Sequence, residues 1–252
     1  MIEIFILSAI QGITEFLPIS SSSHLILVSN YLNFDNRSLE IDVSLHIGSF
    51  LAVIVFFKND ICNFFKKKEL FFKIIISSTP VMLLGFILVK YNLISELRNI
   101  KIIGWMTIIF GILLYFSDKF KTKNKIDNNF NYKSAILIGI FQIFSLIPGV
   151  SRSGVAITAA RFLNFNRVDS VKISFLLSIP TLAAVSIFGL SNIINSNSFQ
   201  FSILNIFSIF LSFIFSFFTI KFFLKYIEKF NLNVFVFYRV ILGLLILIFA
   251  YL

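Results

Sequence analysis

The stretch "EFLPISSSSHLI", residues 15–26, interrupts an apolar chain with a carboxylate, a proline, four consecutive serines and a histidine. A second stretch, "SLIPGVSRSGVA" at residues 145–156, repeats its pattern. The two align when three pairs are matched: Pro18 with Pro148, Ser21 with Ser151, and Ser23 with Ser153. The repeated break divides the chain into two related halves.

The composition around these breaks is that of a membrane protein. Of 252 residues, 58% are hydrophobic and 13% are charged, about half of the roughly 25% that soluble domains carry. A soluble protein of this size could not bury so much apolar surface, so we expect a bilayer around it. The start, Met1 to Glu3, has no basic region and predicts no cleavable signal peptide. Cys62 is the single cysteine, which excludes an intrachain disulfide.

The net charge of +10 is concentrated in short loops between apolar runs. Lysines gather at 66–68, 119–125 and 221–229. Basic loops between apolar segments are typical of the cytoplasmic side of membrane proteins. The positions of the lysines therefore predict which side of the membrane each loop faces. We expect no nucleic-acid partner.

Six apolar segments are long enough to cross about 30 Å of hydrocarbon as helices. They run at about 41–57, 70–90, 100–117, 170–190, 203–223 and 235–252. Two further apolar stretches, 1–33 and 134–164, are broken near the middle, so that each half is too short to cross. Each is either one kinked span or a re-entrant hairpin. Non-helical backbone at membrane depth requires protein or a watery cavity around it.

The lysine loops favour the second alternative. If loops 58–69, 118–133 and 224–234 are cytoplasmic, residues 33–40, 91–99 and 191–202 face outward and both termini are external. We predict one all-α integral membrane domain over 1–252. It consists of six transmembrane helices and two re-entrant broken-helix hairpins.

An internal repeat organises this domain. Repeat 1 covers about 1–117, a cytoplasmic linker covers about 118–133, and repeat 2 covers about 134–252. Each repeat has one hairpin and three spans, and because three is odd the second repeat is inverted. Inverted repeats with broken helices place their site near the midplane, where the breaks meet.

The second break offers groups that bind phosphate. Ser151, Arg152 and Ser153 follow Pro148-Gly149 at the expected start of a half-helix. A helix N-terminus favours a phosphate through its free N–H groups and its dipole, and arginine adds a planar fork. An arginine inside a membrane is costly, so it needs a partner or a task. The alternative is an arginine that pairs with an acidic residue only for structure.

The first break offers complementary groups. Gln11 and Glu15 lie four residues apart on one helix face, and Ser20 to Ser23 lead into the next half-helix. Serine needs a base to become a nucleophile, and His24, three residues after Ser21, is the nearest candidate. A buried Glu15 stays ionised beside Arg152 or His24. The alternative is that the serines only cap a helix.

Asp42 and His46 form another pair four residues apart, at the start of the 41–57 span. His46 either faces the same cavity or is an interfacial histidine held by Asp42. Neither His24 nor His46 has the spacing of zinc ligands, so we expect no tight zinc site.

Together these motifs resemble the undecaprenyl-diphosphate phosphatases, the bacitracin-resistance proteins of bacteria. The first family motif matches Gln11, Glu15 and "PISSSSH", and the second matches "PGVSRS". "LHIGSFLAV" (45–53) and "ISFLLSIP" (173–180) resemble the stretches that follow them. The resemblance covers the whole chain in order and spacing.

The resemblance implies hydrolysis of undecaprenyl diphosphate, or a similar polyprenyl diphosphate, to the monophosphate and phosphate. This reaction recycles the lipid carrier for cell-wall synthesis and confers bacitracin resistance, among the lipids of the bacterial inner membrane. Carried over by position, the catalytic residues are Glu15 as acid, Ser21 as nucleophile, His24 as general acid/base and Arg152 as phosphate clamp. The implied substrate-binding residues are Gln11, Ser20, Ser22, Gly149, Ser151 and Ser153. One departure is Ala156, where the family usually has threonine; Thr158 lies on another helix face.

The resemblance also makes Mg²⁺ or Ca²⁺ plausible, held through Glu15, with no organic cofactor. The nucleophile stays open between Ser21 and a water activated by Glu15 and His24. A homodimer stays open too. The alternative function is a lipid flippase or transporter, because inverted repeats with broken helices are transporter architecture. A phosphatidic-acid-phosphatase type of site needs a histidine after the arginine, and no histidine follows His46.

Overall fold

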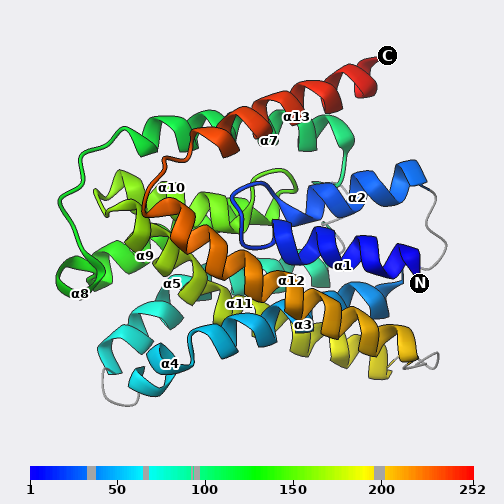
Figure 1. Cartoon of the computed structure of the whole chain (residues 1–252), viewed down its shortest axis with the longest axis horizontal. Coiled ribbons are helices and arrows are strands. Elements are labelled where there is room, and N and C mark those ends of the chain that lie inside the picture. The colour runs from blue at the N-terminus through cyan, green and yellow to red at the C-terminus, as the bar shows by residue number, and fades with distance from the viewer. Residues whose placement is uncertain (33–37, 65–67, 92, 94–96, 196–201) are drawn as a thin grey trace.

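The computed structural model (Figure 1) is built of helices. It describes all residues except 33–37, 65–67, 92, 94–96 and 196–201. The helices of the described residues are, in chain order, α1 (Ile2–Thr14), α2 (Ser21–Leu32), α3 (Leu39–Phe56), α4 (Lys58–Phe64), α5 (Lys68–Lys90), α7 (Ile100–Asp118), α8 (Ile126–Asn129), α9 (Tyr132–Gln142), the 3-10 helix η1 (Ile143–Leu146), α10 (Arg152–Phe162), α11 (Arg167–Asn195), α12 (Ile203–Ile227) and α13 (Asn233–Tyr251).

The six predicted spans are confirmed as helices. Within the described residues, six helices are long and apolar enough to cross a membrane: α3, α5, α7, α11, α12 and α13. The largest difference from prediction is at α11, which begins at Arg167 and continues to Asn195. Pro180 lies inside this helix, where neighbouring helices can accommodate the lost backbone hydrogen bond. The chain is an all-α membrane protein.

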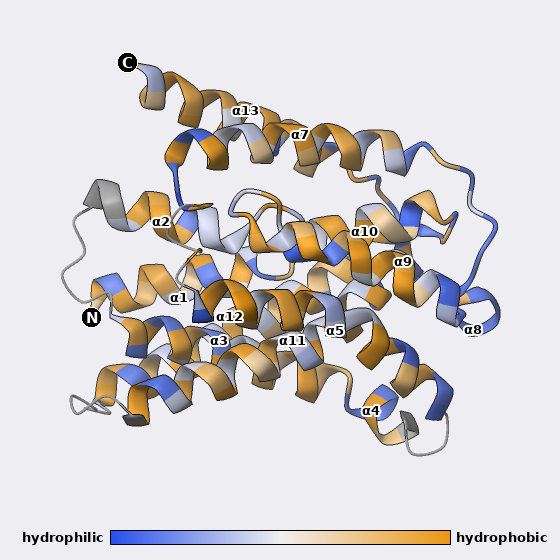
Figure 2. Ribbon diagram, turned by 180° about the vertical axis from the view of Figure 1, so that it is seen from behind, coloured by the Kyte–Doolittle hydropathy of each residue, from blue (hydrophilic) through white to orange (hydrophobic). Residues whose placement is uncertain are grey.

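The two ends of the molecule differ in polarity. In Figure 2 the long helices are mainly hydrophobic, whereas α8 and the loop that leads to it are hydrophilic. Both termini lie at the end opposite α8 (Figures 1 and 2). This agrees with the lysine loops, which predict that both termini lie on the side opposite residues 118–133. The assignment of one end to the cytoplasm stays a prediction. The loops at 33–40, 58–69, 91–99 and 191–202 lie partly outside the described residues.

Both predicted breaks are present. α1 ends at Thr14 and α2 begins at Ser21, and η1 ends at Leu146 before α10 begins at Arg152. The two halves of each broken stretch contact each other, α1 with α2 and α9 with α10. Whether these hairpins enter and leave the bilayer at one face stays a prediction.

The helices pack in mirrored pairs. α12 packs on α1 and α3, and α5 packs on α9 and α11, while α7 packs on α13 and α3 on α11. Exchanging α1 with α9, α3 with α11, α5 with α12 and α7 with α13 leaves this set of pairs unchanged. This exchange symmetry is expected of an internal repeat, and the inversion of the second repeat stays a prediction. The exact division at residues 118–133 stays a prediction.

The segment between the repeats is held by a buried ionic cluster. Arg167 Nε donates to Asp118 Oδ1 at 2.7 Å, and Arg161 Nε lies 3.4 Å from the same oxygen. Arg161 also donates to the carbonyls of Asp118 and Phe120. The cluster ties the end of α7 to the turn between α10 and α11, at the end of the molecule where α8 lies.

The largest core cluster reaches the first break directly. Phe16 is fully buried and meets the ring of Phe175 edge-on at 5.3 Å. Phe175 also contacts Phe57 and Phe223, from α3 and α12. Such aromatic pairs add to the energy of burial. Because Phe16 is anchored in this way, the neighbouring Glu15 is held in place at the end of α1.

Candidate active site

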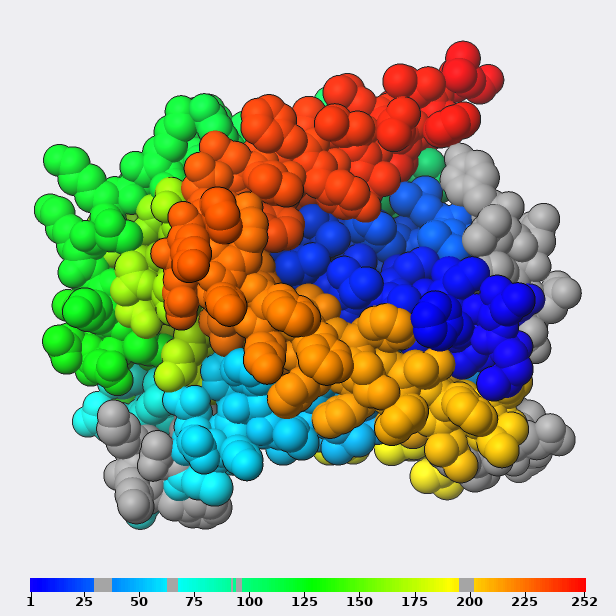
Figure 3. All heavy atoms as spheres, in the orientation of Figure 1, coloured from blue at the N-terminus to red at the C-terminus, as the bar shows by residue number. Residues whose placement is uncertain are grey.

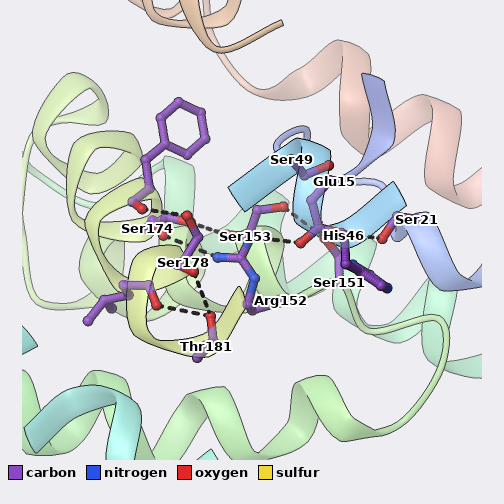
Figure 4. A network of polar contacts seen from close by, with 12 residues as sticks. Glu15, Ser21, His46, Ser49, Ser151, Arg152, Ser153, Ser174, Ser178 and Thr181 are labelled. Carbon is purple, nitrogen blue, oxygen red and sulfur yellow. Dashed lines mark hydrogen bonds and ion pairs between the residues drawn. The ribbon is translucent and has the colours of Figure 1, made fainter. Parts of the chain in front are cut away.

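A cavity of about 390 Å³ lies where the two breaks meet. Its polar side chains come from both breaks and from α3 and α11 (Figure 4). The polar lining residues are Glu15, Ser20, Ser21, Ser22, His46, Ser145, Ser151, Arg152 and Thr181. The rest of the lining is apolar and comes mainly from α5 and α11. A volume of this size suits a small charged group together with part of an apolar chain.

Glu15 is at the centre of the polar contacts. Its Oε1 accepts a hydrogen bond from Arg152 Nη2 at 3.0 Å. Its Oε2 accepts from Ser21 Oγ at 2.7 Å and from Gln11 Nε2 at 3.1 Å. The carboxyl is 7% exposed, and a buried carboxylate is tolerated only with such partners. Glu15 thus joins the arginine of one break to the serine of the other.

Arg152 is the first residue of α10 and lies across the cavity from Ser21. Its Nη1 donates to the carbonyl of Ser174 on α11 at 3.3 Å, and its side chain is 14% exposed. The guanidinium therefore has a carboxylate on one side and a carbonyl on the other, and it borders the cavity. This arrangement leaves donors available to phosphoryl oxygens. Arg152 also forms an ion pair with Glu15, which is the pairing expected if the arginine had only a structural role.

His46 faces the cavity rather than the edge of the membrane. Its Nδ1 accepts from Gln11 Nε2 at 3.1 Å, so it is two contacts away from the carboxylate of Glu15. Asp42, one turn earlier on α3, is not among the residues that line the cavity. Of the two positions considered for His46, the structure has the one inside the site.

Two serines at the breaks share an unusual backbone. Ser20 and Ser151 have positive φ angles of 73° and 72°, which non-glycine residues adopt at a cost of about 1–3 kcal/mol. Each directly precedes a half-helix, α2 or α10. Ser151 Oγ accepts from the backbone N–H of Gly154 at 3.1 Å, as an N-cap does. Ser20 therefore corresponds to Ser151, one residue before the match that the sequence repeat suggested.

This shift changes which residues are equivalent. Ser21 and Arg152 become the matched pair, each the first residue of its half-helix. Ser22 also lines the cavity, whereas Ser23 is buried and its hydroxyl contacts that of Ser20 at 3.0 Å. Three of the four serines, Ser20, Ser21 and Ser22, therefore line the cavity, and of these Ser21 donates to the carboxylate of Glu15.

The two breaks are bonded to each other behind the cavity. Ser153 Oγ donates to the carbonyl of Leu17 at 2.7 Å, and the N–H of Gly149 donates to Ser20 Oγ at 3.3 Å. Gly149 has a φ of 99°, and a Cβ there would lie 2.6 Å from the carbonyl oxygen of Ile103, so only glycine fits. Neither Ser153 nor Gly149 lines the cavity. Both were predicted to bind substrate, and the structure has them behind the cavity, Gly149 in the loop and Ser153 in the first turn of α10.

His24 does not reach Ser21. Its Nδ1 donates to the carbonyl of Ser20 at 2.7 Å, and its Nε2 contacts the hydroxyl of Tyr238 on α13. The imidazole also stacks on the Tyr238 ring, and it does not line the cavity. The spacing of three residues was expected to bring His24 and Ser21 onto one face. At the first turn of α2 the two side chains instead diverge, one toward Glu15 and one toward α13.

Thr158 does not replace the hydroxyl absent at Ala156. Its Oγ1 donates to the carbonyl of Gly154, one turn earlier in α10, at 2.8 Å. Both Thr158 and Ala156 are buried and lie outside the cavity lining.

Arg239 is a functional candidate that sequence reasoning missed. It is fully buried on α13 and donates to the carbonyls of Pro18 at 3.1 Å, Gly149 at 2.8 Å and Thr107 at 3.2 Å. One guanidinium therefore holds both broken loops in register. The sequence contains one indication of this role, because Arg239 lies in the middle of an apolar span. A charge there costs free energy unless it has a partner or a function.

The site has oxygens for a cation but no dedicated cage. Within the described part of the chain, no three or more His, Cys, Asp or Glu side chains gather to hold a metal. Gln11 Oε1 is buried without a hydrogen-bond partner, while Nε2 of the same amide donates to the carboxylate of Glu15. These two residues provide hard oxygen ligands of the kind that Mg²⁺ and Ca²⁺ take, which they complete with substrate or water.

Comparison with known proteins identifies the family. Residues 4–245 match the sequence model of the bacitracin resistance protein BacA family. The chain is 51% identical to the undecaprenyl-diphosphatase of Pelagibacter ubique (strain HTCC1062), over all of this chain and 98% of the relative. It is 35% identical to the undecaprenyl-diphosphatase of Jannaschia sp. (strain CCS1) and 34% identical to that of Roseobacter denitrificans, each over all of this chain and 99% of the relative. With its two breaks, its Glu15–Arg152 pair and this agreement over its whole length, the chain belongs to the bacitracin resistance protein BacA family.

Proposed function

We propose that this protein hydrolyses undecaprenyl diphosphate, or a similar long polyprenyl diphosphate, to the monophosphate and phosphate. The proposal rests on one cavity in which Glu15, Ser21 and Arg152 meet and whose wall from α5 and α11 is mainly apolar. A lipid diphosphate has the same two parts, an anionic head and an apolar chain. Curated relatives of the family bear the name undecaprenyl-diphosphatase.

Arg152 would bind the diphosphate. Its fork sits at the N-terminus of α10, where the helix dipole and free N–H groups also favour an anion. Arg152 already contacts Glu15 and the Ser174 carbonyl, so its orientation is fixed before substrate arrives. Preorganised donors of this kind stabilise charge that develops on transferring phosphoryl oxygens.

Ser21 would attack the terminal phosphorus, with Glu15 as its base. Ser21 Oγ already donates a hydrogen bond to Glu15 Oε2 at 2.7 Å, so this base is in reach without rearrangement. A bond forms between Ser21 Oγ and phosphorus, the bond from phosphorus to the bridging oxygen breaks, and the prenyl monophosphate leaves. Water then cleaves the phosphoserine and releases phosphate. In the second route, Glu15 activates a water that attacks directly.

Gln11 and His46 would position the base, since Gln11 contacts both Glu15 and His46. Glu15 and the unpaired Oε1 of Gln11 would hold a divalent cation, which would supply additional positive charge beside the diphosphate. We propose Mg²⁺ or Ca²⁺ because the available donors are oxygens.

The proposed setting is the bacterial inner membrane, with both termini external and 118–133 cytoplasmic. The lysine-rich loops support this orientation. In that membrane the reaction recycles the lipid carrier of cell-wall precursors, and so confers resistance to bacitracin.

Phosphate release from undecaprenyl diphosphate by the purified protein in detergent tests the proposal. We expect turnover by the wild type and loss of turnover in Glu15→Gln, with Glu69→Gln, an exposed glutamate on α5, as the matched control. Movement of the lipid across vesicles without phosphate release would indicate the transporter alternative instead.

A further inference from the structure

The apolar wall of the cavity is formed by two helices. Lining residues on each recur every three or four positions, so each helix turns one face toward the cavity. On α5 they are Val81, Met82, Gly85, Phe86 and Val89; on α11 they are Leu182, Ala184, Val185 and Phe188. We call this set the α5–α11 groove.

The groove leads from the charged groups to the surface. At its inner end, Val81 and Leu182 are 6% and 3% exposed. At its outer end, Phe86 and Val185 are 55% and 45% exposed. The rise from Val81 to Val89 along α5 is about 12 Å. The cavity therefore opens sideways between two membrane-spanning helices.

The surface around the opening is also apolar. Leu83 and Ile87 on α5 and Ile187 on α11 flank the groove and are largely exposed. Both helices are long and apolar enough to span the membrane, so side chains exposed along them face hydrocarbon. An opening at this place gives the site a direct connection to lipid chains.

The mirrored helix pair, α3 and α12, is closed. A Cβ on Gly48 would lie 2.4 Å from the carbonyl oxygen of Ile209, which shows how closely the two backbones approach. Ser49 and Ser212 hydroxyls contact each other at 3.2 Å, and Ser216 donates to Ser49 at 3.0 Å. Small residues with hydroxyl contacts make a tight interface in membranes. Figure 3 shows α12 lying against the α3 side of the molecule.

We propose that the prenyl chain of the substrate leaves the head-group site through the α5–α11 groove, so that its first isoprene units are bound there. The proposal rests on the proposed function, because it takes the occupant to be a prenyl diphosphate. The diphosphate at Arg152 lies at the inner end of the groove, and its chain needs an apolar path to the bilayer. The closed α3–α12 pair offers none.

Two small residues set the width of the groove. A Cβ on Gly85 would lie 3.2 Å from Leu146 Cδ2, and Ala184 lines the opposite helix. Larger side chains at either position fill the space that the chain occupies, while leaving the groups around Arg152 in place. These positions select for a slender chain.

Enzyme kinetics with two substrates test this path. Gly85→Leu and Ala184→Trp each fill the groove, and Leu83→Trp and Ile187→Trp are matched controls that add bulk outside it. The measured quantity is kcat/KM for a fifteen-carbon prenyl diphosphate divided by kcat/KM for the five-carbon compound. We expect this ratio to fall at least ~10-fold in both groove variants, because even two unburied methylene groups weaken binding by about that factor. An unchanged ratio in both, or an equal fall in the controls, would overturn the proposal.

Cross-linking tests the path without relying on turnover or on a folded variant. Wild-type protein is irradiated with a prenyl diphosphate that carries a diazirine on its second isoprene unit. We expect labelled peptides at 81–89 and 181–188, with labelling suppressed by excess unlabelled prenyl diphosphate. Labels on α2 or α13, or labelling that the competitor does not suppress, would contradict it. If wild type releases no phosphate while these peptides are labelled, the proposed hydrolysis fails and the binding path stands.

Discussion

The two breaks share one backbone plan and differ in their chemistry. Each has a serine with positive φ, Ser20 or Ser151, followed at once by a half-helix. The first residue of that half-helix is Ser21 in one break and Arg152 in the other. Where the first break has Glu15, the matched position of the second break is the apolar Leu146, a lining residue of the cavity. The two breaks thus supply complementary halves of one site.

Each half of the site depends on the other. Glu15 of the first break accepts from Arg152 of the second, and Ser153 of the second donates to Leu17 of the first. Arg239 then bonds to the carbonyls of both loops. Substitutions in either break therefore test the same assembly.

The largest loss of turnover is expected at Ser21, the first residue of α2. Ser21→Ala removes the hydroxyl that donates to Glu15, and loss of a nucleophile lowers kcat by at least ~10³-fold. Phosphate release is measured beside Ser22→Ala, which changes a neighbouring serine and should stay within about threefold of wild type. Appreciable turnover in Ser21→Ala, with Glu15→Gln inactive, would point to the water route.

The second-largest effect is expected at Arg152, the first residue of α10. Arg152→Lys keeps the charge but loses the fork that reaches both Glu15 and the Ser174 carbonyl. We expect kcat to fall ~100-fold, as when one preorganised donor is removed. Arg167→Lys at the far end of the molecule is the matched control, since it makes the same change in the Asp118 cluster. Near-normal turnover in Arg152→Lys would leave this residue a structural role only.

A smaller loss of turnover is expected at Arg239, which donates to carbonyls of both breaks. Arg239→Lys cannot reach three carbonyls at once, and each buried carbonyl left without a donor costs about 1–3 kcal/mol. We expect kcat to fall ~10-fold and the melting temperature to fall by several degrees. Thermal unfolding and phosphate release in the same detergent measure both. Full activity with a lowered melting temperature would show that the register of the two loops is unimportant for turnover.

The smallest effect is expected at His24. It faces Tyr238 and not Ser21, so His24→Gln should lower kcat less than about threefold. His46→Gln, in contrast, changes a cavity residue in contact with Gln11 and should cost about tenfold. A loss in His24→Gln that matches the loss in Ser21→Ala would restore His24 as the general base expected from spacing.

Much of the fold was predictable because the bilayer imposes simple rules. A run of about 20 apolar residues forms a helix, since backbone groups in hydrocarbon must bond within their own segment. The six spans and the two breaks followed from this rule. The need of a buried charge for an opposite one limited the partner of Glu15 to Arg152 or His24, and the structure has Arg152 in that place.

The helices, the breaks and the chemical types of the groups that meet follow from the order of residues along the chain. Which of those groups turn toward the cavity depends on how the helices pack. His24 and His46 are both near acidic or hydroxyl groups along the chain, yet His46 lines the site and His24 packs on Tyr238. Likewise the α5–α11 groove is open while the related α3–α12 pair is closed. The physical reason is that a side chain's direction depends on the first turn of its helix and on its neighbours from distant segments, and sequence spacing contains neither.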